Sequence, residues 1–260
     1  MTLHVGKTII VTGGAGAIGF ATAKILAAEA AQVVLVNING EGLDKAGAEL
    51  RRRDVAVETI CADCSQEEAV KHYVEATVRR FGRIDGFFNN AGVEGMLAPT
   101  WDYPVDEFDR IIAINLRGMF LGLRHVLPLM IKQGSGTVVN TASIAGERGL
   151  AGACAYNASK HGVVGLTRTA ASEAGPKGVR VNCVMPGMIE TPMIRGQLEQ
   201  FDTVEEGLET LSRVATLNRV ARPEEVGRVV SFLLSHDASF VNGAAWEVDG
   251  GALATIRNDI

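Results

Sequence analysis

The stretch VTGGAGAIGF, from Val11 to Phe20, decides how the rest of the chain is interpreted. It follows an apolar run at 7–11 and precedes an alanine-rich run at 21–31, and four of its ten residues are glycine. Glycine adopts backbone angles that other residues avoid, so one interpretation is a tight turn between a strand and a helix. The other is a phosphate-binding turn, where missing side chains let an anion approach the N–H groups of a helix N-terminus. The stretch alone leaves both open.

Short apolar runs alternate with longer helical segments along the whole chain. We expect strands at 7–12, 32–37, 56–61, 84–89, 137–142, 180–185 and 245–248. We expect helices at 18–30, 41–53, 66–81, 105–133, 155–175 and 223–235. Such alternation predicts an α/β fold, a single-domain, Rossmann-type doubly wound parallel sheet with helices on both faces. No linker or repeat divides residues 1–260, and the segment 188–217 is the natural lid over a substrate.

The glycine stretch therefore lies between the first strand and the first helix of a βαβ unit. A dinucleotide-binding turn belongs at this place, with an acidic residue on the ribose about twenty residues further on. The second strand ends there at Asn37, which is an amide rather than an acid. The context favours dinucleotide binding over a turn with no ligand.

Composition narrows the class of protein. The chain has 260 residues, 47% hydrophobic and 21% charged, which is typical of a globular protein. Its net charge of −5 argues against a nucleic-acid partner. No apolar run reaches the roughly 18 residues of a membrane span, and no secretory signal is seen, so we expect a cytoplasmic protein with no membrane partner. Cys61 and Cys64 form a lone CxxC without a second ligand pair, so no metal is expected.

Several residues that carry chemistry follow the later strands. Tyr156 and Lys160 are four apart in AYNASKHG and share one face of a helix. An adjacent ammonium favours the phenolate and lowers a tyrosine pKa from about 10, which makes a proton-transfer pair. Ser143 closes another strand, at the edge where ligands bind to parallel sheets. Asn115 lies inside a predicted helix, where a buried amide that satisfies a backbone group is the simplest interpretation.

Together these motifs resemble those of the short-chain dehydrogenase/reductase family over essentially the whole chain. The resemblance also includes NNAG at 89–92, PGMIET at 186–191 and VDGG at 248–251. The resemblance implies a catalytic tetrad of Asn115, Ser143, Tyr156 and Lys160. Tyr156 would exchange the proton, and Lys160 would lower its pKa and hold the nicotinamide ribose. Ser143 would bind the substrate oxygen, and Asn115 would hold a water that links Lys160 to solvent.

The resemblance also implies a nicotinamide cofactor. The implied cofactor-binding residues are Gly13, Ala17, Ile18, Gly19, Asn37, Asp63, Cys64, Asn90, Tyr156, Lys160, Ile189 and Thr191. Ala17 stands where the family usually has a glycine. An aspartate at position 37 would repel the 2′-phosphate of NADP⁺, and Asn37 lacks that charge. Residues 14–17 and 38–40 hold no basic residue to meet a phosphate, so NAD is expected rather than NADP.

The implied activity is an NAD(H)-dependent oxidoreductase that interconverts a secondary alcohol and a ketone. The expected substrate residues are Ser143, Tyr156, Glu94, Glu147 and Met188, with Arg148 also placed to select a substrate. Apolar lid residues are Met188, Ile189, Met193, Ile194, Leu198 and Phe201, which either line an apolar pocket or anchor the lid.

Two other functions stay open, and one assembly is expected. One alternative is a 3-oxoacyl-thioester reductase that uses NADPH and docks an acidic carrier protein on basic residues: Arg124, Lys132 and Arg168. The other is a non-catalytic dinucleotide sensor on the same fold. The resemblance implies a homotetramer paired through small residues of the long helices: Gly118, Gly122, Ala158, Gly162, Val163 and Gly165.

Overall fold

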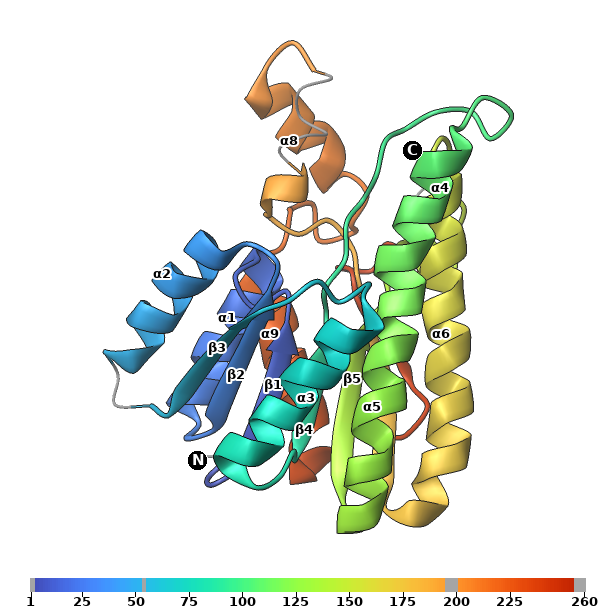
Figure 1. Ribbon diagram of the computed structural model, residues 1–260. Coiled ribbons are helices and arrows are strands. Elements are labelled where there is room, and N and C mark those ends of the chain that lie inside the picture. The colour runs from blue at the N-terminus through green and yellow to red at the C-terminus, as the bar shows by residue number, and fades with distance from the viewer. Residues whose placement is uncertain (1–2, 53–54, 195–200, 255–260) are drawn as a thin grey trace.

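A single parallel sheet of seven strands organises the computed structural model, which describes residues 3–52, 55–194 and 201–254 (Figure 1). The strands are β1 (Thr8–Thr12), β2 (Gln32–Asn37), β3 (Val57–Cys61), β4 (Gly86–Asn89), β5 (Gly136–Thr141), β6 (Val179–Pro186) and β7 (Ala245–Val248). Their spatial order is β3-β2-β1-β4-β5-β6-β7, and all neighbours are parallel. The predicted doubly wound parallel sheet is confirmed, whereas one domain over 1–260 stays a prediction.

Helices cover both faces of the sheet because successive strand residues point to opposite sides. The helices are α1 (Ala17–Ala28), α2 (Gly40–Arg51), α3 (Glu67–Phe81), α4 (Val105–Ile112), α5 (Gly118–Gln133), α6 (Cys154–Ala174), α8 (Val204–Ser212) and α9 (Pro223–Leu234). Ile9 and Val11 of β1 pack with residues of α1, α2 and α9. Ile10, between them, packs with residues of α3, α5 and α6. Each such buried side chain stabilises the fold by about 1.5–3 kcal/mol.

The helix predicted at 105–133 contains an irregularity that the sequence pattern does not show. A π-helical segment, η1 (Ala113–Arg117), separates α4 from α5, and Asn115 lies inside it. Such segments are rare and occur often at functional sites. Three short 3-10 helices complete the described elements: η2 (Ile144–Gly146), η3 (Gly175–Lys177) and η4 (His236–Ala238).

Helix α8 lies in the segment predicted only as a lid. Thr203 caps its N-terminus, because the Thr203 hydroxyl accepts a hydrogen bond from the Glu206 amide at 3.1 Å. Threonine followed three residues later by glutamate is a recognised helix start, so this element was readable from the sequence. The prediction placed no helix between 188 and 217, so α8 is an element that it missed.

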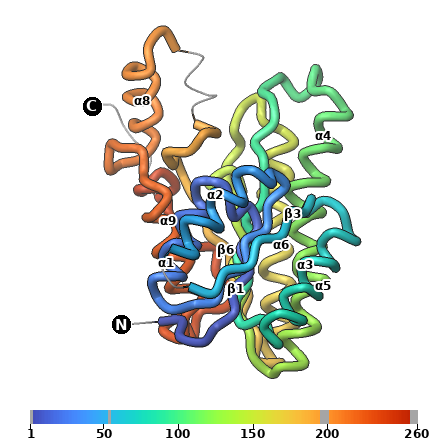
Figure 2. The backbone as a smooth tube through the Cα atoms, turned by 60° about the vertical axis from the view of Figure 1, so that its left-hand side comes forward, coloured from blue at the N-terminus to red at the C-terminus, as the bar shows by residue number. Residues whose placement is uncertain are grey.

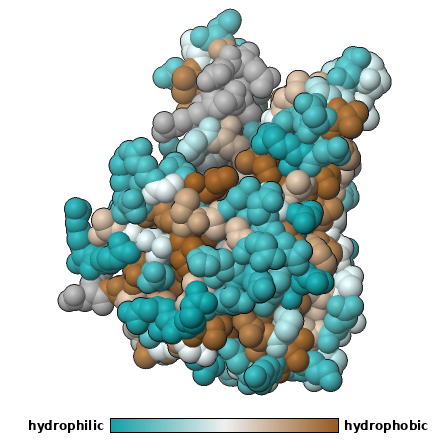
Figure 3. Space-filling model, in the orientation of Figure 1, coloured by the Kyte–Doolittle hydropathy of each residue, from teal (hydrophilic) through white to brown (hydrophobic). Residues whose placement is uncertain are grey.

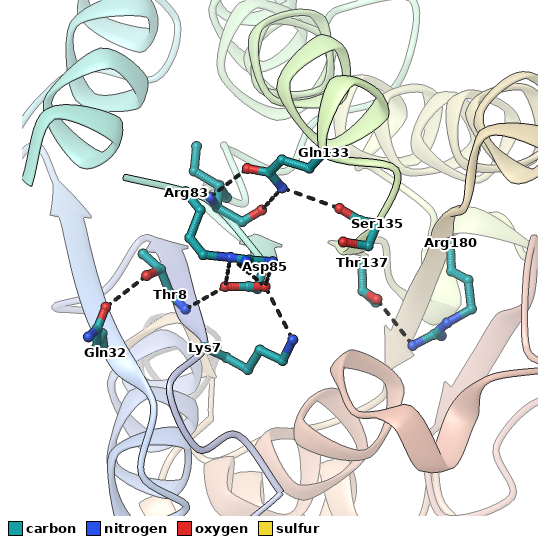
Figure 4. Close-up of polar contacts among 10 residues, drawn as sticks. Lys7, Thr8, Gln32, Arg83, Asp85, Gln133, Ser135, Thr137 and Arg180 are labelled. Carbon is teal, nitrogen blue, oxygen red and sulfur yellow. Dashed lines mark hydrogen bonds and ion pairs between the residues drawn. The ribbon is translucent and has the colours of Figure 1, made fainter. Parts of the chain in front are cut away.

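A polar network closes the amino-terminal edge of the sheet (Figure 4). The buried Asp85 carboxylate accepts hydrogen bonds from the Thr8 amide at 3.0 Å, from Lys7 at 3.3 Å and from Arg83. The Gln133 side chain binds the backbone of Ile84 through both its oxygen and its nitrogen, at 3.1 and 2.8 Å. Lys7 and Arg83 both pair with Asp85, so we assign these charged groups a structural role.

The opposite edge of the sheet is open. The strand order reverses at β1, which pairs with β2 on one side and β4 on the other. Ligands of open α/β sheets bind at such a switch point, outside the carboxyl ends of the strands. The segments that carry α8 and α4 both project from this edge (Figures 1 and 2), and the space-filling view shows a notch between them (Figure 3). The candidate site is therefore expected beneath the notch.

Candidate active site

The glycine turn after β1 needs two of its glycines for its own packing. Gly13 has a φ of +65°, and a Cβ there would lie 2.8 Å from Nδ2 of Asn90. A Cβ on Gly19 would lie 2.2 Å from the carbonyl oxygen of Gly13, which is closer than atoms can approach. The first interpretation of the stretch, a tight strand-to-helix turn, describes these two positions.

The same turn also fits the diphosphate of a dinucleotide. Helix α1 begins at Ala17 after Gly16, and neither a side-chain cap nor an acidic residue satisfies its first turn. The first N–H groups of a helix have no partner within the helix and carry a partial positive charge, so they suit an anion. The adjacent Ile18 is partly buried against the hydrophobic core. A tight turn and a phosphate site are therefore compatible here.

The ends of β2 and β3 carry the residues expected at the adenosine. Oδ1 of Asn37 accepts a hydrogen bond from the Asn39 amide at 2.9 Å, so one acceptor position is already used. Asp63 holds the Ser65 amide at 2.9 Å in the same way. Burial raises the pKa of the Cys64 thiol to about 12, which leaves it protonated and unsuited to redox chemistry. All four cysteines are free in the structure.

Asn90 ties three strands together. Its backbone amide donates to the Thr12 hydroxyl at 2.8 Å, and its Nδ2 donates to the Thr12 carbonyl at 3.0 Å. Its Oδ1 accepts from the Thr141 hydroxyl at 3.0 Å. This one amide fixes the carboxyl ends of β1, β4 and β5 against each other at the switch point. Contact with the adenosine ribose stays a prediction.

Lys160 and Tyr156 lie together on α6, as their spacing predicts. Lys160 is 3% exposed, and its ammonium donates to the Thr141 carbonyl at 2.9 Å. The ammonium lies 5.4 Å from the centroid of the Tyr156 ring. Burial lowers the pKa of Lys160 to about 8, because a low dielectric disfavours the charged form. A Cβ on Gly92 would lie 3.1 Å from Oδ1 of Asn115, so the glycine leaves room for that buried amide.

The phenol of Tyr156 differs from the expectation in one respect. Burial raises its pKa to about 12, a hydrogen bond with Ser143 lowers it in part, and the charge of Glu94 raises it further. Lys160 was expected to lower this pKa, but its ammonium is directed to the Thr141 carbonyl. Ser143 is held in place as the N-cap of η2, where its hydroxyl accepts from the Ala145 amide at 3.1 Å.

Asn115 is fully buried, and its amide pairs with the backbone of the loop after β4. Its Oδ1 accepts from the Val93 amide at 2.8 Å, and its Nδ2 donates to the Val93 carbonyl at 2.7 Å and to Ser159 at 3.3 Å. Ser159 in turn donates to the carbonyl of Tyr156 at 2.7 Å. The π-helical segment, the loop and α6 are thus joined through one side chain.

The remaining predicted residues fall into two groups. Ile189 is buried in the core and its strand-like backbone pairs with Ala221, whereas Thr191 and Met188 are half-buried beyond the end of β6. Glu147 and Arg148 are exposed after η2, and both terminal nitrogens of Arg148 are bound to backbone carbonyls.

Sequence reasoning missed three residues that hold the tetrad: Val93, Thr141 and Ser159. Each is adjacent or close in sequence to a motif residue, so a backbone or hydroxyl partner could have been sought there. Among the described residues, no group of three or more histidine, cysteine, aspartate or glutamate side chains is placed to hold a metal ion. Within the same part of the chain, no helix is long and apolar enough to cross a membrane.

A family model described as "Enoyl-(Acyl carrier protein) reductase" matches residues 13–252. Levodione reductase of Leifsonia aquatica is 47% identical over 257 residues, which cover 97% of this chain and 96% of that protein. The chain belongs to the short-chain dehydrogenase/reductase family.

Other members of the short-chain dehydrogenase/reductase family support the same assignment. Cyclohexanol dehydrogenase of Acinetobacter sp. (strain SE19) is 38% identical over 244 residues, 94% of each chain. The crystal structure of levodione reductase matches with a TM-score of 0.95 at 46% identity, covering 97% of this chain and 100% of that one. NAD⁺-bound xylitol dehydrogenase matches with a TM-score of 0.91 at 38% identity, covering 95% and 99%. This short-chain dehydrogenase/reductase is thus an oxidoreductase that acts on CH–OH groups with a nicotinamide cofactor.

Proposed function

We propose that this enzyme interconverts a cyclic secondary alcohol and its ketone with NAD(H). The observation that carries the proposal is the phenol of Tyr156, hydrogen-bonded to Ser143 and backed by the buried Lys160 ammonium. Cyclohexanol, for which one relative is named, is a cyclic secondary alcohol.

In the direction of ketone reduction, Tyr156 donates the proton and Ser143 donates a hydrogen bond to the substrate oxygen as negative charge develops on it. The nicotinamide, when bound, supplies or accepts the hydride, and its positive charge in the oxidised form favours the phenolate. A pKa of about 12 keeps Tyr156 protonated at neutral pH, which suits a proton donor. Oxidation of an alcohol uses the same residues in reverse, with the phenolate as base.

Lys160 and Asn115 serve the proton-transfer group in this proposal. Lys160 holds a positive charge near the phenol. After each ketone reduction, the phenolate of Tyr156 regains a proton from solvent by way of Lys160. The Asn115 side chain is committed to Val93 and Ser159. Any water that Asn115 holds is therefore bound by its backbone carbonyl, within the π-helical segment.

The lid around 188–217 is part of the proposal. Ile189 and Ile194 are buried and anchor the segment, whereas Met193 is 39% exposed and Val204 of α8 is 55% exposed. Leu198 lies outside the described residues. We therefore assign lid anchoring to the two isoleucines and substrate contact to the half-buried Met188 and the exposed Met193.

A substrate screen tests the proposed activity. Cyclic and aromatic secondary alcohols with NAD⁺, and the matching ketones with NADH, are followed by the absorbance of NADH. We expect turnover of cyclohexanol or a substituted cyclohexanol. The control is 1-methylcyclohexanol, a tertiary alcohol whose carbinol carbon has no hydride to give. Failure of every secondary alcohol and every matching ketone would contradict the proposal.

The preference for NAD over NADP is tested at Asn37. We expect the kcat/KM ratio to favour NAD⁺ in the wild type and to rise about tenfold in Asn37→Asp, a difference of about 1.4 kcal/mol. A carboxylate at the end of β2 repels the 2′-phosphate and accepts ribose hydroxyls, whereas Asn37 already uses Oδ1 for Asn39. Asn39→Asp is the matched control, because it adds the same charge two residues away and keeps its own cap on Gly42. A wild-type preference for NADP⁺ of about tenfold or more would overturn the assignment.

The alternative functions draw less support from the site. Arg124, one of the residues proposed to dock a carrier protein, is paired with Glu67 at 3.1 Å. A dinucleotide sensor needs no proton-transfer group, and here the phenol, the hydroxyl and the ammonium are gathered in one place. We therefore keep the alcohol and ketone oxidoreductase as the proposal.

A homotetramer remains our proposal for the assembly. Fewer residues of the long helices are available for contact with a second copy than the sequence suggested. A Cβ on Gly122 would lie 2.8 Å from the Phe87 ring, and one on Gly162 would lie 2.8 Å from Leu116, so both serve packing within the chain. Gly165 faces open space, and Phe120 of α5 is 44% exposed. These outward positions on α5 and α6 suit contact with a second copy.

A further inference from the structure

The loop between the two predicted catalytic residues Ser143 and Tyr156, residues 147–153, is anchored at three points. The Leu150 amide donates to Oδ1 of Asn157 at 3.2 Å, and Nδ2 of Asn157 donates back to the Leu150 carbonyl at 2.8 Å. The Gly152 carbonyl accepts from the Ala98 amide at 2.9 Å, in the loop after β4. The third anchor is Arg148.

Arg148 binds the residues that follow β7. Its two terminal nitrogens donate to the Ala252 and Leu253 carbonyls, each at 2.8 Å. A guanidinium presents its donors in a planar fork, so two neighbouring carbonyls fix its orientation as well as its position. Because both terminal nitrogens are used in this way, Arg148 is better placed to hold the loop than to contact a substrate directly.

The partner of Arg148 is a rigid turn at 249–253, called here the C-terminal turn. The buried Asp249 carboxylate accepts from the Gly251 amide at 2.8 Å and from the Leu253 amide at 2.7 Å. Gly250 and Gly251 have φ values of +64° and +86°, which residues with side chains rarely adopt. The turn also packs against the end of β6, since a Cβ on Gly187 would lie 2.9 Å from Cα of Asp249.

The C-terminal turn also holds the base of the lid. The Thr216 hydroxyl donates to the Gly250 carbonyl at 2.8 Å, and the Leu217 amide donates to the same oxygen at 3.2 Å. The 147–153 loop and the lid, which lie on different parts of the chain, are therefore attached to one turn.

We infer that Arg148 is a positioning residue, which couples the 147–153 loop to the lid through the C-terminal turn and so sets substrate affinity. The inference rests on the proposed function, and it adds that the 147–153 loop borders the substrate together with the described part of the lid. Ser143 and Tyr156 have their own anchors in η2 and α6, so the chemical step and cofactor binding do not depend on Arg148.

Kinetics of Arg148→Met test the inference. We expect the KM for the cyclic alcohol to rise about fivefold or more, with kcat and the Kd for NADH within about twofold of wild type. Arg148→Lys, which keeps a donor, should recover part of the affinity. Arg79→Met is the matched control, because this exposed arginine of α3 pairs, within the described part of the chain, with Glu75 of its own helix. An unchanged KM, or a parallel fall of kcat, NADH affinity and melting temperature, would overturn the inference.

A second variant tests the coupling itself. Thr216→Val removes the hydroxyl that holds Gly250 and should raise the KM in the same direction. If both act through the C-terminal turn, the double variant should be less impaired than the product of the two single effects. Independent, multiplicative effects would overturn the coupling. Should Arg148→Met not fold, Arg148→Lys combined with Thr216→Val completes the same cycle.

Hydrogen exchange provides a readout that needs no substrate. In Arg148→Met without cofactor, the amides of 147–153 and 249–254 should exchange faster than in wild type, while those of α3 stay unchanged. Equal exchange in the two proteins would overturn the inference. A wild type that is inactive on every alcohol and ketone sinks the proposed function instead, and leaves this measurement valid.

Discussion

Tyr156→Phe is expected to lower kcat by about 10³-fold, because proton transfer by a positioned acid or base contributes roughly 10²–10⁴. NADH should still bind within about twofold of wild type, since the change removes one hydroxyl and leaves the ring on α6. The measurements are steady-state turnover of the alcohol found in the screen and a fluorescence titration with NADH. The same variant should also lose the rise of oxidation rate with pH. That rise is expected in the wild type because the phenolate fraction grows as pH approaches the raised pKa of Tyr156.

Tyr103→Phe is the matched control for that result. The hydroxyl of Tyr103 is buried and has no hydrogen-bond partner in the described part of the chain, so its removal should leave kcat unchanged. Activity of Tyr156→Phe within a few-fold of wild type would contradict the assignment of the proton-transfer group. Loss of NADH binding together with activity would indicate a structural role for Tyr156.

Gly19→Ala is expected to damage both folding and cofactor binding. The new Cβ would lie 2.2 Å from the Gly13 carbonyl oxygen and 2.8 Å from its carbon, and these are backbone atoms that cannot rotate away. Overpacking of this kind costs about 1–3 kcal/mol, and the shift it forces on α1 moves the N–H groups expected to bind the diphosphate. We expect a lower urea midpoint and an NADH affinity reduced about tenfold or more, a loss of about 1.4 kcal/mol.

Gly165→Ala provides the comparison for Gly19→Ala. Gly165 also lies in a helix, but an added Cβ meets nothing within 4 Å in the chain. Alanine is favoured over glycine in a helix by about 1 kcal/mol, so within one chain this variant should be as stable as wild type or more so, with unchanged NADH affinity. Any effect on the proposed contact with a second copy is followed separately, by the mass in solution. If Gly19→Ala keeps the wild-type urea midpoint and NADH affinity, the turn can accommodate a Cβ at position 19 and the prediction is wrong.

Much of the fold could be predicted because local pattern and tertiary burial agree. Strand β2 was placed at 32–37 with both boundaries correct, since its residues form a continuous apolar run between polar ends. The parallel sheet followed from the alternation of such runs with helical segments. The glycine stretch could be placed at a turn because a strand and a helix flank it within a few residues, whereas Gly13 and Gly19 were singled out by the family resemblance.

The features that escaped prediction depend on contacts between distant parts of the chain. Asn115, within the π-helical segment, is hydrogen-bonded to the backbone of Val93, a contact that no local pattern encodes. The Tyr156 pKa is governed by burial, by the hydrogen bond with Ser143 and by Glu94, 62 positions earlier in the chain, rather than by the neighbour four residues away. Likewise, nothing near Arg148 in the sequence indicates that its partners are Ala252 and Leu253.

The Asn115 side-chain amide is hydrogen-bonded to the backbone of Val93, and the Arg148 guanidinium donates to the backbone carbonyl of Ala252. An anchor to backbone atoms is indifferent to the side chain that the anchored residue carries, unless that residue becomes proline where an amide is needed. The side chains of the anchored residues can therefore change while the hydrogen bonds that position their backbone are kept. For directed evolution, this separates two sets of positions. Residues whose side chains make these hydrogen bonds should be held constant, and residues that take part only through their backbone, such as Val93, are the ones to randomise in a search for new substrates.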